Sequence, residues 1–167
     1  MSGKVPMTRE GHKSLTRELR RLKAKERPKI INEIAIAREH GDLSENAEYD
    51  AAKEKQSLIE GRIRDIEDKL SRAEVIDTCE NDTNRVVFGT VVHLRDENDG
   101  NELKYQIVGA DEADPRQRKI SVHSPIARAL IGKEVRELVK IKVPAGVKEY
   151  TILGINSVIS HYSESHK

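Results

Sequence analysis

The sequence predicts an α+β protein. An N-terminal antiparallel coiled-coil hairpin of α-helices should be followed by a small, mostly antiparallel β domain with one short helix. Residues 8–77 are rich in Glu, Lys, Arg, Ala and Leu, which favour helices. Residues 86–160 contain runs of β-branched residues separated by turn signals. We therefore expect a helical domain over residues 1–78, a polar linker over 79–85, a β-rich domain over 86–160 and a polar tail over 161–167.

The most regular hydrophobic pattern in the chain lies in the second half of the helical segment. Its seam positions alternate in steps of four and three residues and comprise Ala52, Gln56, Ile59, Ile63, Ile66, Leu70 and Ala73. Such spacing places these side chains on one face of a helix, and it is typical of a coiled coil.

The first half of the helical segment has a less regular seam, which consists of Leu15, Leu19 and Leu22, then Ile30, Ile34 and Ala37. The step from Leu22 to Ile30 is one residue longer than a heptad, and it contains Pro28. Proline removes a helical hydrogen bond and bends a helix. Because the seam continues beyond the proline, we expect a kink or local phase slip near Lys25–Lys29 and no break.

A short polar segment, Gly41-Asp42-Leu43-Ser44, separates the two seams. Glycine suits the left-handed position that ends a helix. Either Asp42 or Ser44 suits the N-cap of the next helix. A link of this length between two apolar-striped helices predicts an antiparallel hairpin.

The hairpin model also predicts a register. Folding about the turn pairs residues whose numbers sum to about 88, and each of the resulting pairs is apolar: Leu15 with Ala73, Leu22 with Ile66, and Ala37 with Ala51. One register therefore accounts for both seams.

The second half of the chain is expected to form the sheet. Its β-branched runs are Val86–Leu94, Leu103–Gly109, Lys119–His123, Val135–Val143 and Val147–Ile155. Asn98-Asp99-Gly100 and Pro144-Ala145-Gly146 mark turns between runs. Ser124, Pro125 and Gly132 predict the N-cap, the first residue and the end of one short helix.

The overall composition excludes several classes of protein. The chain carries 30 Lys and Arg against 29 Asp and Glu, so it has no surplus of positive charge with which to coat duplex DNA. The single cysteine, Cys79, excludes a disulfide framework and a cysteine-cluster zinc site. No apolar run approaches the ~18 residues of a membrane span, and no signal-peptide core is present. We expect a cytoplasmic monomer with no membrane partner.

Charge is nevertheless segregated along the helical segment. Residues 8–38 hold ten basic and four acidic residues, and residues 39–60 hold two basic and seven acidic residues. The hairpin should therefore have a basic shaft and an acidic tip.

Two acids in the turn suggest a chemical role. Asp42 and Glu45 are three residues apart, and two such carboxylates can share a divalent metal ion or orient a water molecule. Mg²⁺ prefers six oxygen ligands, so most of its ligands would have to come from elsewhere. Alternatively, Asp42 and Glu45 form a capping box at the start of the second helix. If Ser44 is the cap, both carboxylates are free.

Two long stretches and one short one resemble a known family. Residues 37–49 (AREHGDLSENAEY) resemble the tip of the bacterial Gre transcript-cleavage factors, and the resemblance is closest to the A-type. Residues 120–133 (ISVHSPIARALIGK) and 111–114 (DEAD) resemble the C-terminal signature of the same family. The resemblance extends from about Met7 to Ile155.

The resemblance implies a transcription elongation factor that is not itself an enzyme and has no cofactor of its own. The coiled coil would enter the secondary channel of RNA polymerase and stimulate cleavage at the 3′ end of backtracked nascent RNA. Asp42 and Glu45 would help to hold Mg²⁺ at the polymerase active site and position the attacking water. The C-terminal domain, similar to the FKBP fold, would dock on the channel rim with His123, Ser124 and Pro125.

The resemblance leaves some residues with two interpretations. Arg38 and Lys53 either face RNA near the tip or belong to a solvated helix face. His123 stands where the family more often has Asn or Asp, so it affects the strength of docking or is a plain loop residue.

Three rival functions rank lower. A channel-occupying inhibitor of the same fold would have altered tip acids, whereas Asp42 and Glu45 are both present. A prolyl isomerase would need an aromatic-lined pocket, but the second half has only four aromatic residues: Phe88, Tyr105, Tyr150 and Tyr162. A zinc-finger coiled-coil regulator is excluded by the single cysteine.

Overall fold

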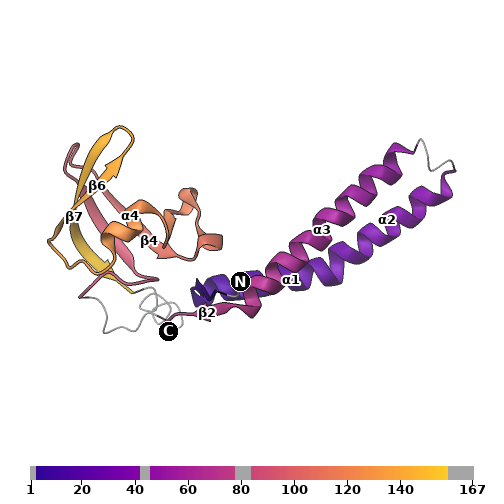
Figure 1. The fold of residues 1–167 in the computed structure, drawn as a ribbon, viewed down its shortest axis with the longest axis horizontal. Coiled ribbons are helices and arrows are strands. Elements are labelled where there is room, and N and C mark those ends of the chain that lie inside the picture. The colour runs from indigo at the N-terminus through magenta and orange to yellow at the C-terminus, as the bar shows by residue number, and fades with distance from the viewer. Residues whose placement is uncertain (1–2, 42–45, 78–83, 158–167) are drawn as a thin grey trace, which may run out of the picture. The chain divides into compact units, whose positions relative to one another are not determined.

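A computed structural model describes residues 3–41, 46–77 and 84–157 (Figure 1). The chain divides into two compact units. The first comprises Met1–Val5 and His12–Ala73, and the second comprises Pro6–Gly11 and Glu74–Lys167. Most of the predicted linker over 79–85 and the whole predicted tail over 161–167 lie outside the described residues.

The helices form the predicted hairpin. Its first arm consists of α1 (Arg9–Arg21), the π-helical segment η1 (Leu22–Glu26) and α2 (Arg27–Glu39), and its second arm is α3 (Ala47–Ser71). The helices α2 and α3 lie side by side (Figure 1). The seam side chains are buried, and they include Leu15, Leu22, Ile30, Ile34, Ala37, Ala52, Ile59, Ile63 and Ile66. Burial of this apolar stripe is what stabilises two otherwise highly charged helices.

The interruption in the first arm is a π-helical turn. The N–H of Arg27 donates to the carbonyl of Leu22, five residues earlier. A π-turn is wider than an α-turn, so it absorbs the extra residue between Leu22 and Ile30 and keeps both side chains buried. The predicted phase slip is confirmed, although it begins three residues before the predicted range.

Two predictions for the helical arms are wrong. First, α3 ends at Ser71, and Ala73–Val75 forms strand β2, which pairs with strand β1 (Val5–Met7). The carbonyl of Arg72 accepts from Val5 and the carbonyl of Met7 accepts from Ile76, so the N-terminal segment replaces helical bonds with sheet bonds. Ala73 is therefore not part of the helical seam.

The second wrong prediction concerns the register near the tip. Ala51, expected to face Ala37, is exposed, whereas the next residue, Ala52, is buried. One residue turns a helix by ~100°, so an offset of one position moves a side chain off the seam.

The second unit contains a five-stranded sheet in the order β5-β4-β3-β7-β6. The strands are β3 (Val91–Asp96), β4 (Glu102–Val108), β5 (Lys119–Ser121), β6 (Leu138–Val143) and β7 (Gly146–Asn156). All neighbours are antiparallel except β4 and β5, which are parallel. The predicted mostly antiparallel sheet is confirmed, and so is the tight turn between β6 and β7.

One short α-helix, α4 (Pro125–Leu130), and two 3₁₀ turns, η2 (Ala110–Glu112) and η3 (Pro115–Gln117), complete this unit. The core combines α4 with the inner face of the sheet, and its least exposed members include Val86, Val92, Leu94, Ile107, Ala127, Leu130 and Ile152. Residues 86–90, expected to begin a strand, precede β3. Val86 instead bonds through its backbone to Gly132 and Lys133, beyond the end of α4.

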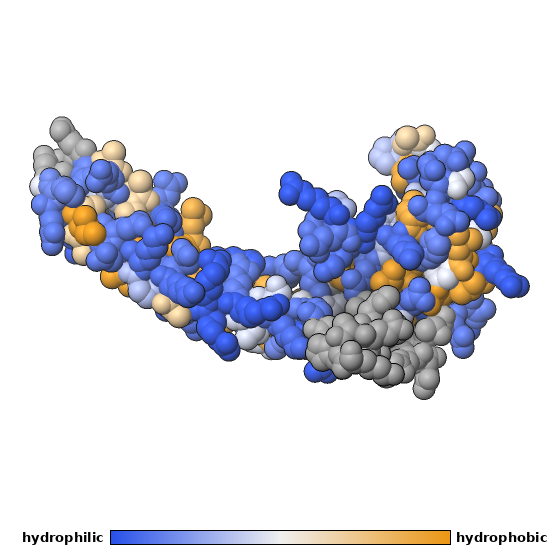
Figure 2. All heavy atoms as spheres, turned by 180° about the vertical axis from the view of Figure 1, so that it is seen from behind, coloured by the Kyte–Doolittle hydropathy of each residue, from blue (hydrophilic) through white to orange (hydrophobic). Residues whose placement is uncertain are grey.

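The surface is largely hydrophilic, with hydrophobic side chains in patches on both units (Figure 2). Exposed examples are Leu58 on the hairpin and Val147 on the sheet. Among the described residues, none of the helices combines the length and the apolar character that a membrane crossing requires.

Candidate functional site

The tip of the hairpin is bounded by the end of α2 and the start of α3. After the last residue of α2, Glu39, the chain passes through His40 to Gly41, whose φ of 107° is in the left-handed range. The prediction that Gly41 ends the helix is thus confirmed. The two predicted catalytic acids, Asp42 and Glu45, lie outside the described residues, and so does Ser44.

The helix α3 has a side-chain cap that the sequence analysis did not identify. Asn46 has an extended backbone conformation, and its Oδ1 accepts a hydrogen bond of 3.1 Å from the backbone N–H of Tyr49. The predicted N-cap at Asp42 or Ser44 is therefore wrong, and so is the predicted capping box. Asn46 directly precedes the first helical residue, and asparagine is among the strongest N-caps. Asn46 therefore fills the capping role that was the alternative to a chemical role for Asp42 and Glu45.

The same side chain also reaches the other arm. Nδ2 of Asn46 donates to the carbonyl of Ala37 over 2.8 Å. That carbonyl, in the last turn of α2, also accepts from the N–H of His40 over 3.3 Å. One amide therefore connects the two helix ends that flank the tip.

Arg38 and Lys53, the predicted RNA-facing residues, are both exposed near the tip. The guanidinium carbon of Arg38 lies 5.9 Å from the centre of the Tyr49 ring, which is within the range of a cation–π contact. Nζ of Lys53 donates to Oε1 of Gln56 over 3.2 Å on the same helix. Arg38 is thus in contact across the hairpin, while Lys53 has a local partner on α3.

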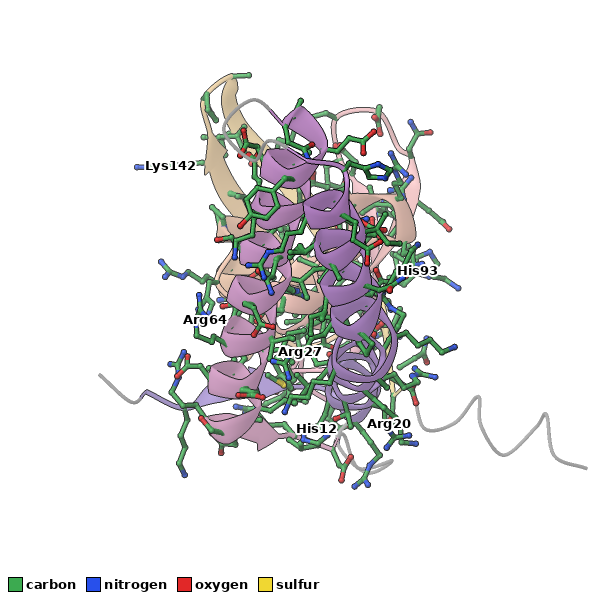
Figure 3. All side chains as sticks on the ribbon, turned by 90° about the vertical axis from the view of Figure 1, so that its right-hand side faces the viewer. His12, Arg20, Arg27, Arg64, His93 and Lys142 are labelled. Carbon is green, nitrogen blue, oxygen red and sulfur yellow. The ribbon has the colours of Figure 1, made fainter. Side chains whose placement is uncertain are left out.

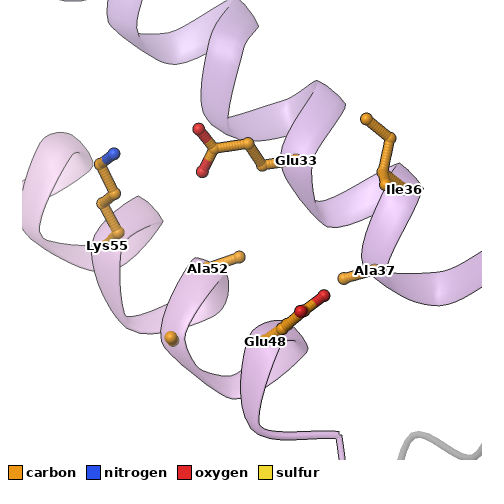
Figure 4. Close-up of a pocket in the computed structure, with 7 residues that line it drawn as sticks. Glu33, Ile36, Ala37, Glu48, Ala52 and Lys55 are labelled. Carbon is orange, nitrogen blue, oxygen red and sulfur yellow. The ribbon is translucent and has the colours of Figure 1, made fainter. Parts of the chain in front are cut away.

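A groove lies between the two helices just behind the tip (Figure 4). Glu33 and Ile36 line it from α2, and Glu48 and Lys55 line it from α3. Alanine side chains between them leave the space open. Within the part of the chain that the structure describes, no group of three or more His, Cys, Asp and Glu side chains is arranged to hold a metal ion.

Ion pairs between the arms fix the shaft behind this groove. Nε and Nη2 of Arg62 lie 2.8 and 2.9 Å from the carboxylate oxygens of Glu18. Hydrogen bonding to Arg62 lowers the pKa of Glu18, and hydrogen bonding to Arg27 lowers the pKa of Glu60. Figure 3 shows Arg27 between the helices, whereas Arg20 and Arg64 point away from them. The shaft therefore combines paired charges with outward-pointing cations.

The predicted docking stretch lies at the start of α4 in the second unit. Oγ of Ser124 accepts from the N–H of Ala127 over 3.3 Å and donates to the carbonyl of Ser121 over 2.7 Å. The predicted N-cap is confirmed, and Pro125 is the first helical residue, as expected. The side chains of His123 and Pro125 are exposed. In this stretch, then, the serine hydroxyl is engaged locally, and the two flanking residues face solvent.

A cationic groove adjoins this stretch. Arg116, Arg118 and Lys119 line it together with Tyr105 and Ser124. These three cations were not predicted as site residues, although they lie within four consecutive positions in η3 and the residues that follow it. The parallel pairing of β5 with β4, which carries Tyr105, has no local sequence signal.

Comparisons with known proteins cover both units. Residues 5–75 match a family model described as "Transcription elongation factor, N-terminal", and residues 81–157 match one described as "Transcription elongation factor, GreA/GreB, C-term". Transcription elongation factor GreA of Alkalilimnicola ehrlichii is 58% identical over 153 residues, which is 91% of this chain and 97% of the relative. The GreA of Phenylobacterium zucineum is 56% identical over 155 residues, with coverage of 93% and 99%.

Solved structures give a looser match. The crystal structure of GreA factor homolog 1 (Gfh1) of Thermus thermophilus is 29% identical to this chain, with a TM-score of 0.42. The match covers 92% of this chain and 99% of that chain.

Proposed function

The chain belongs to the GreA/GreB family of transcription elongation factors, and from this membership we propose that it stimulates the intrinsic RNA cleavage of RNA polymerase in backtracked complexes. The observation that carries the proposal is the 58% identity to a GreA over 91% of the chain. Membership means that the protein acts in transcription elongation, and therefore on RNA polymerase. Removal of the extruded 3′ end of the RNA would let an arrested polymerase resume synthesis.

The hairpin is the part proposed to enter the secondary channel of the polymerase. Its second arm, α3, has 25 residues, which at 1.5 Å per residue gives a length of about 37 Å. Two packed helices of this length are narrow enough to reach into a channel while their base stays outside. This geometry supports a role in reach, since the hairpin encloses no large core.

Asp42 and Glu45 are proposed to act at the polymerase active centre. Carboxylate oxygens are the ligands that Mg²⁺ prefers, so the two acids would add to a metal held mainly by the polymerase. Such a metal supplies charge stabilisation and an activated water for phosphodiester cleavage. One observation supports this assignment: the capping role at the start of α3 is filled by Asn46, which leaves the two acids without that role. The protein would thus assist a catalyst without being one.

The second unit is proposed to bind the rim of the channel through His123, Ser124 and Pro125. The exposure of His123 and Pro125 supports this assignment. Arg38 and Lys53 are proposed to face the extruded RNA, since both are exposed cations close to the tip.

A reconstituted reaction tests the proposed function. RNA polymerase is stalled in a backtracked complex with labelled RNA, and the protein is added with Mg²⁺. We expect release of short 3′ fragments and renewed elongation from the new 3′ end. If no fragment is released although the protein binds the polymerase, the protein is an occupancy regulator and the proposal is wrong.

A further inference from the structure

We propose that Asn46 is a positioning residue for RNA cleavage, because its side chain ties together the two helix ends that flank the tip acids. This inference deepens the proposed function and rests on it. Asn46 would act through Asp42 and Glu45, without touching RNA or metal itself.

The side-chain amide of Asn46 makes a pair of hydrogen bonds. Oδ1 accepts from the N–H of Tyr49 over 3.1 Å, and Nδ2 donates to the carbonyl of Ala37 over 2.8 Å. Both bonds are partly buried. One bond satisfies an orphan N–H at the start of α3, and the other gives the Ala37 carbonyl near the end of α2 a second donor besides the N–H of His40. The amide therefore caps α3 and links it to α2.

Among the common N-cap residues, asparagine alone suits both bonds at this position. Aspartate has acceptor oxygens but no donor when ionised, so it would keep the cap and lose the link to Ala37. Serine is a good N-cap, but its side chain is too short to reach the other arm as well. Alanine would lose both bonds. The two roles of Asn46 can therefore be removed one at a time.

A second contact crosses the hairpin beside this link. Arg38 follows Ala37 on α2, and its guanidinium lies over the ring of Tyr49, the residue whose N–H Asn46 accepts. The base of the tip is thus closed by an amide link and a cation–π contact. Two contacts that share neighbouring residues restrain both the separation of the arms and their relative rotation.

These two contacts bound the segment that carries the tip acids. Ala37 and Asn46, which the amide hydrogen bond joins, lie on either side of the segment that carries both acids. Eight residues lie between them in the chain. Fixing the ends of a short segment reduces the number of geometries in which its carboxylates can be presented. Catalysis is sensitive to displacements of about 1 Å in a positioned group. Loss of the link should therefore reduce the rate at saturation more than the affinity for polymerase.

The experiment compares three full-length variants in the backtracked elongation complex. N46S keeps the cap and loses the link, N46A loses both, and E60Q is a control that weakens the hairpin far from the tip. The readouts are the cleavage rate at saturating protein, the protein concentration for half-maximal rate, the Mg²⁺ concentration for half-maximal rate, and the thermal unfolding midpoint. The control shows how much cleavage depends on general stability of the hairpin.

We expect N46S to lower the saturating cleavage rate about tenfold and to raise the Mg²⁺ requirement, with little change in the protein concentration for half-maximal rate. E60Q should leave the saturating rate unchanged. The inference is overturned if N46S cleaves like the native protein, or if E60Q loses as much activity as N46S. A parallel Asp42→Ala/Glu45→Ala variant separates the role of Asn46 from the role of the tip acids. If it is inactive while N46S is fully active, only the role of Asn46 is wrong. If it is active, the proposed role of the two tip acids fails. If the native protein itself releases no RNA, the proposed function fails.

Discussion

Arg27 and Glu60 form a two-point ion pair between α2 and α3. Nε lies 2.7 Å from Oε1 and Nη2 lies 2.9 Å from Oε2, although the residues are 33 positions apart in the chain. The fork of the guanidinium matches the carboxylate, so the pair specifies both the spacing and the register of the arms. It lies on the flank of the apolar seam, where Ile30 and Ile59 are buried.

The first prediction is that the hairpin loses stability in acid. Hydrogen bonds from arginine lower the pKa values of Glu18 and Glu60 below their ordinary value of 4.5. The stabilisation is therefore fully present above pH 4.5, and it is lost as the pH falls through the lowered pKa values of the folded state. Circular dichroism at 222 nm during heating, at several pH values between 7 and 3, measures the effect.

The variant E60Q provides the control for this prediction. It lacks the carboxylate of Glu60, so its melting temperature should fall less steeply with acid than that of the native protein. Identical pH profiles for the two proteins would show that the ion pair does not contribute to folding.

The second prediction contrasts two glycines inside helices. At Gly61 in α3 a Cβ would have only one neighbour, a flexible arginine nitrogen 3.9 Å away. Gly61→Ala should therefore stabilise the protein by about 0.5–1 kcal/mol, because glycine is a poor helix former. At Gly11 in α1 a Cβ would lie 2.1 Å from the carboxyl carbon of Glu112. Gly11→Ala should instead be destabilising.

The clash that alanine would make at position 11 has a structural cause, and chemical denaturation can test it. The carboxylate of Glu112 accepts hydrogen bonds from the backbone and the hydroxyl of Thr8 and from the N–H of Gly109. A methyl group at position 11 displaces it from these donors. Urea unfolding of the two alanine variants should shift the midpoint in opposite directions; a shift in the same direction for both would contradict the packing described.

The third prediction separates folding from docking in the second unit. Ser124→Ala removes the N-cap of α4 and should cost about 1 kcal/mol of stability. His123 is exposed, so His123→Ala should leave the free energy of unfolding within ~0.5 kcal/mol of the native value. If the stretch binds polymerase as proposed, His123→Ala should still weaken binding in a competition assay. Unchanged binding would remove His123 from the docking surface.

The hairpin was predictable because its apolar residues recur at regular intervals in the sequence. Spacings of four and three residues identify the buried face, and the extra residue before Ile30 identified the phase slip that the structure accommodates as a π-turn. The end of α3 was not predictable in the same way. Ala73 continues the helical spacing, and a three-residue strand that pairs with residues near the N-terminus has no periodic signal of its own.

The cap of α3 illustrates a different limit. Asp42, Ser44 and Asn46 are all good N-cap residues within five positions, so propensity alone does not rank them. The choice depends on where the second arm can begin while Ala52 stays on the seam, and that is a property of the packed hairpin. The neighbouring order of β4 and β5 depends on tertiary packing for the same reason.

Asp42 and Glu45 are proposed to enable RNA polymerase to cleave backtracked RNA. The most direct test compares the native protein with an Asp42→Asn/Glu45→Gln variant, which preserves side-chain size and removes both negative charges, in a backtracked elongation complex with Mg²⁺. Cleavage is measured together with binding to polymerase. We expect the variant to bind as tightly as the native protein and to release at most about one hundredth as much RNA per unit time. Equal cleavage by the two proteins would contradict this proposal.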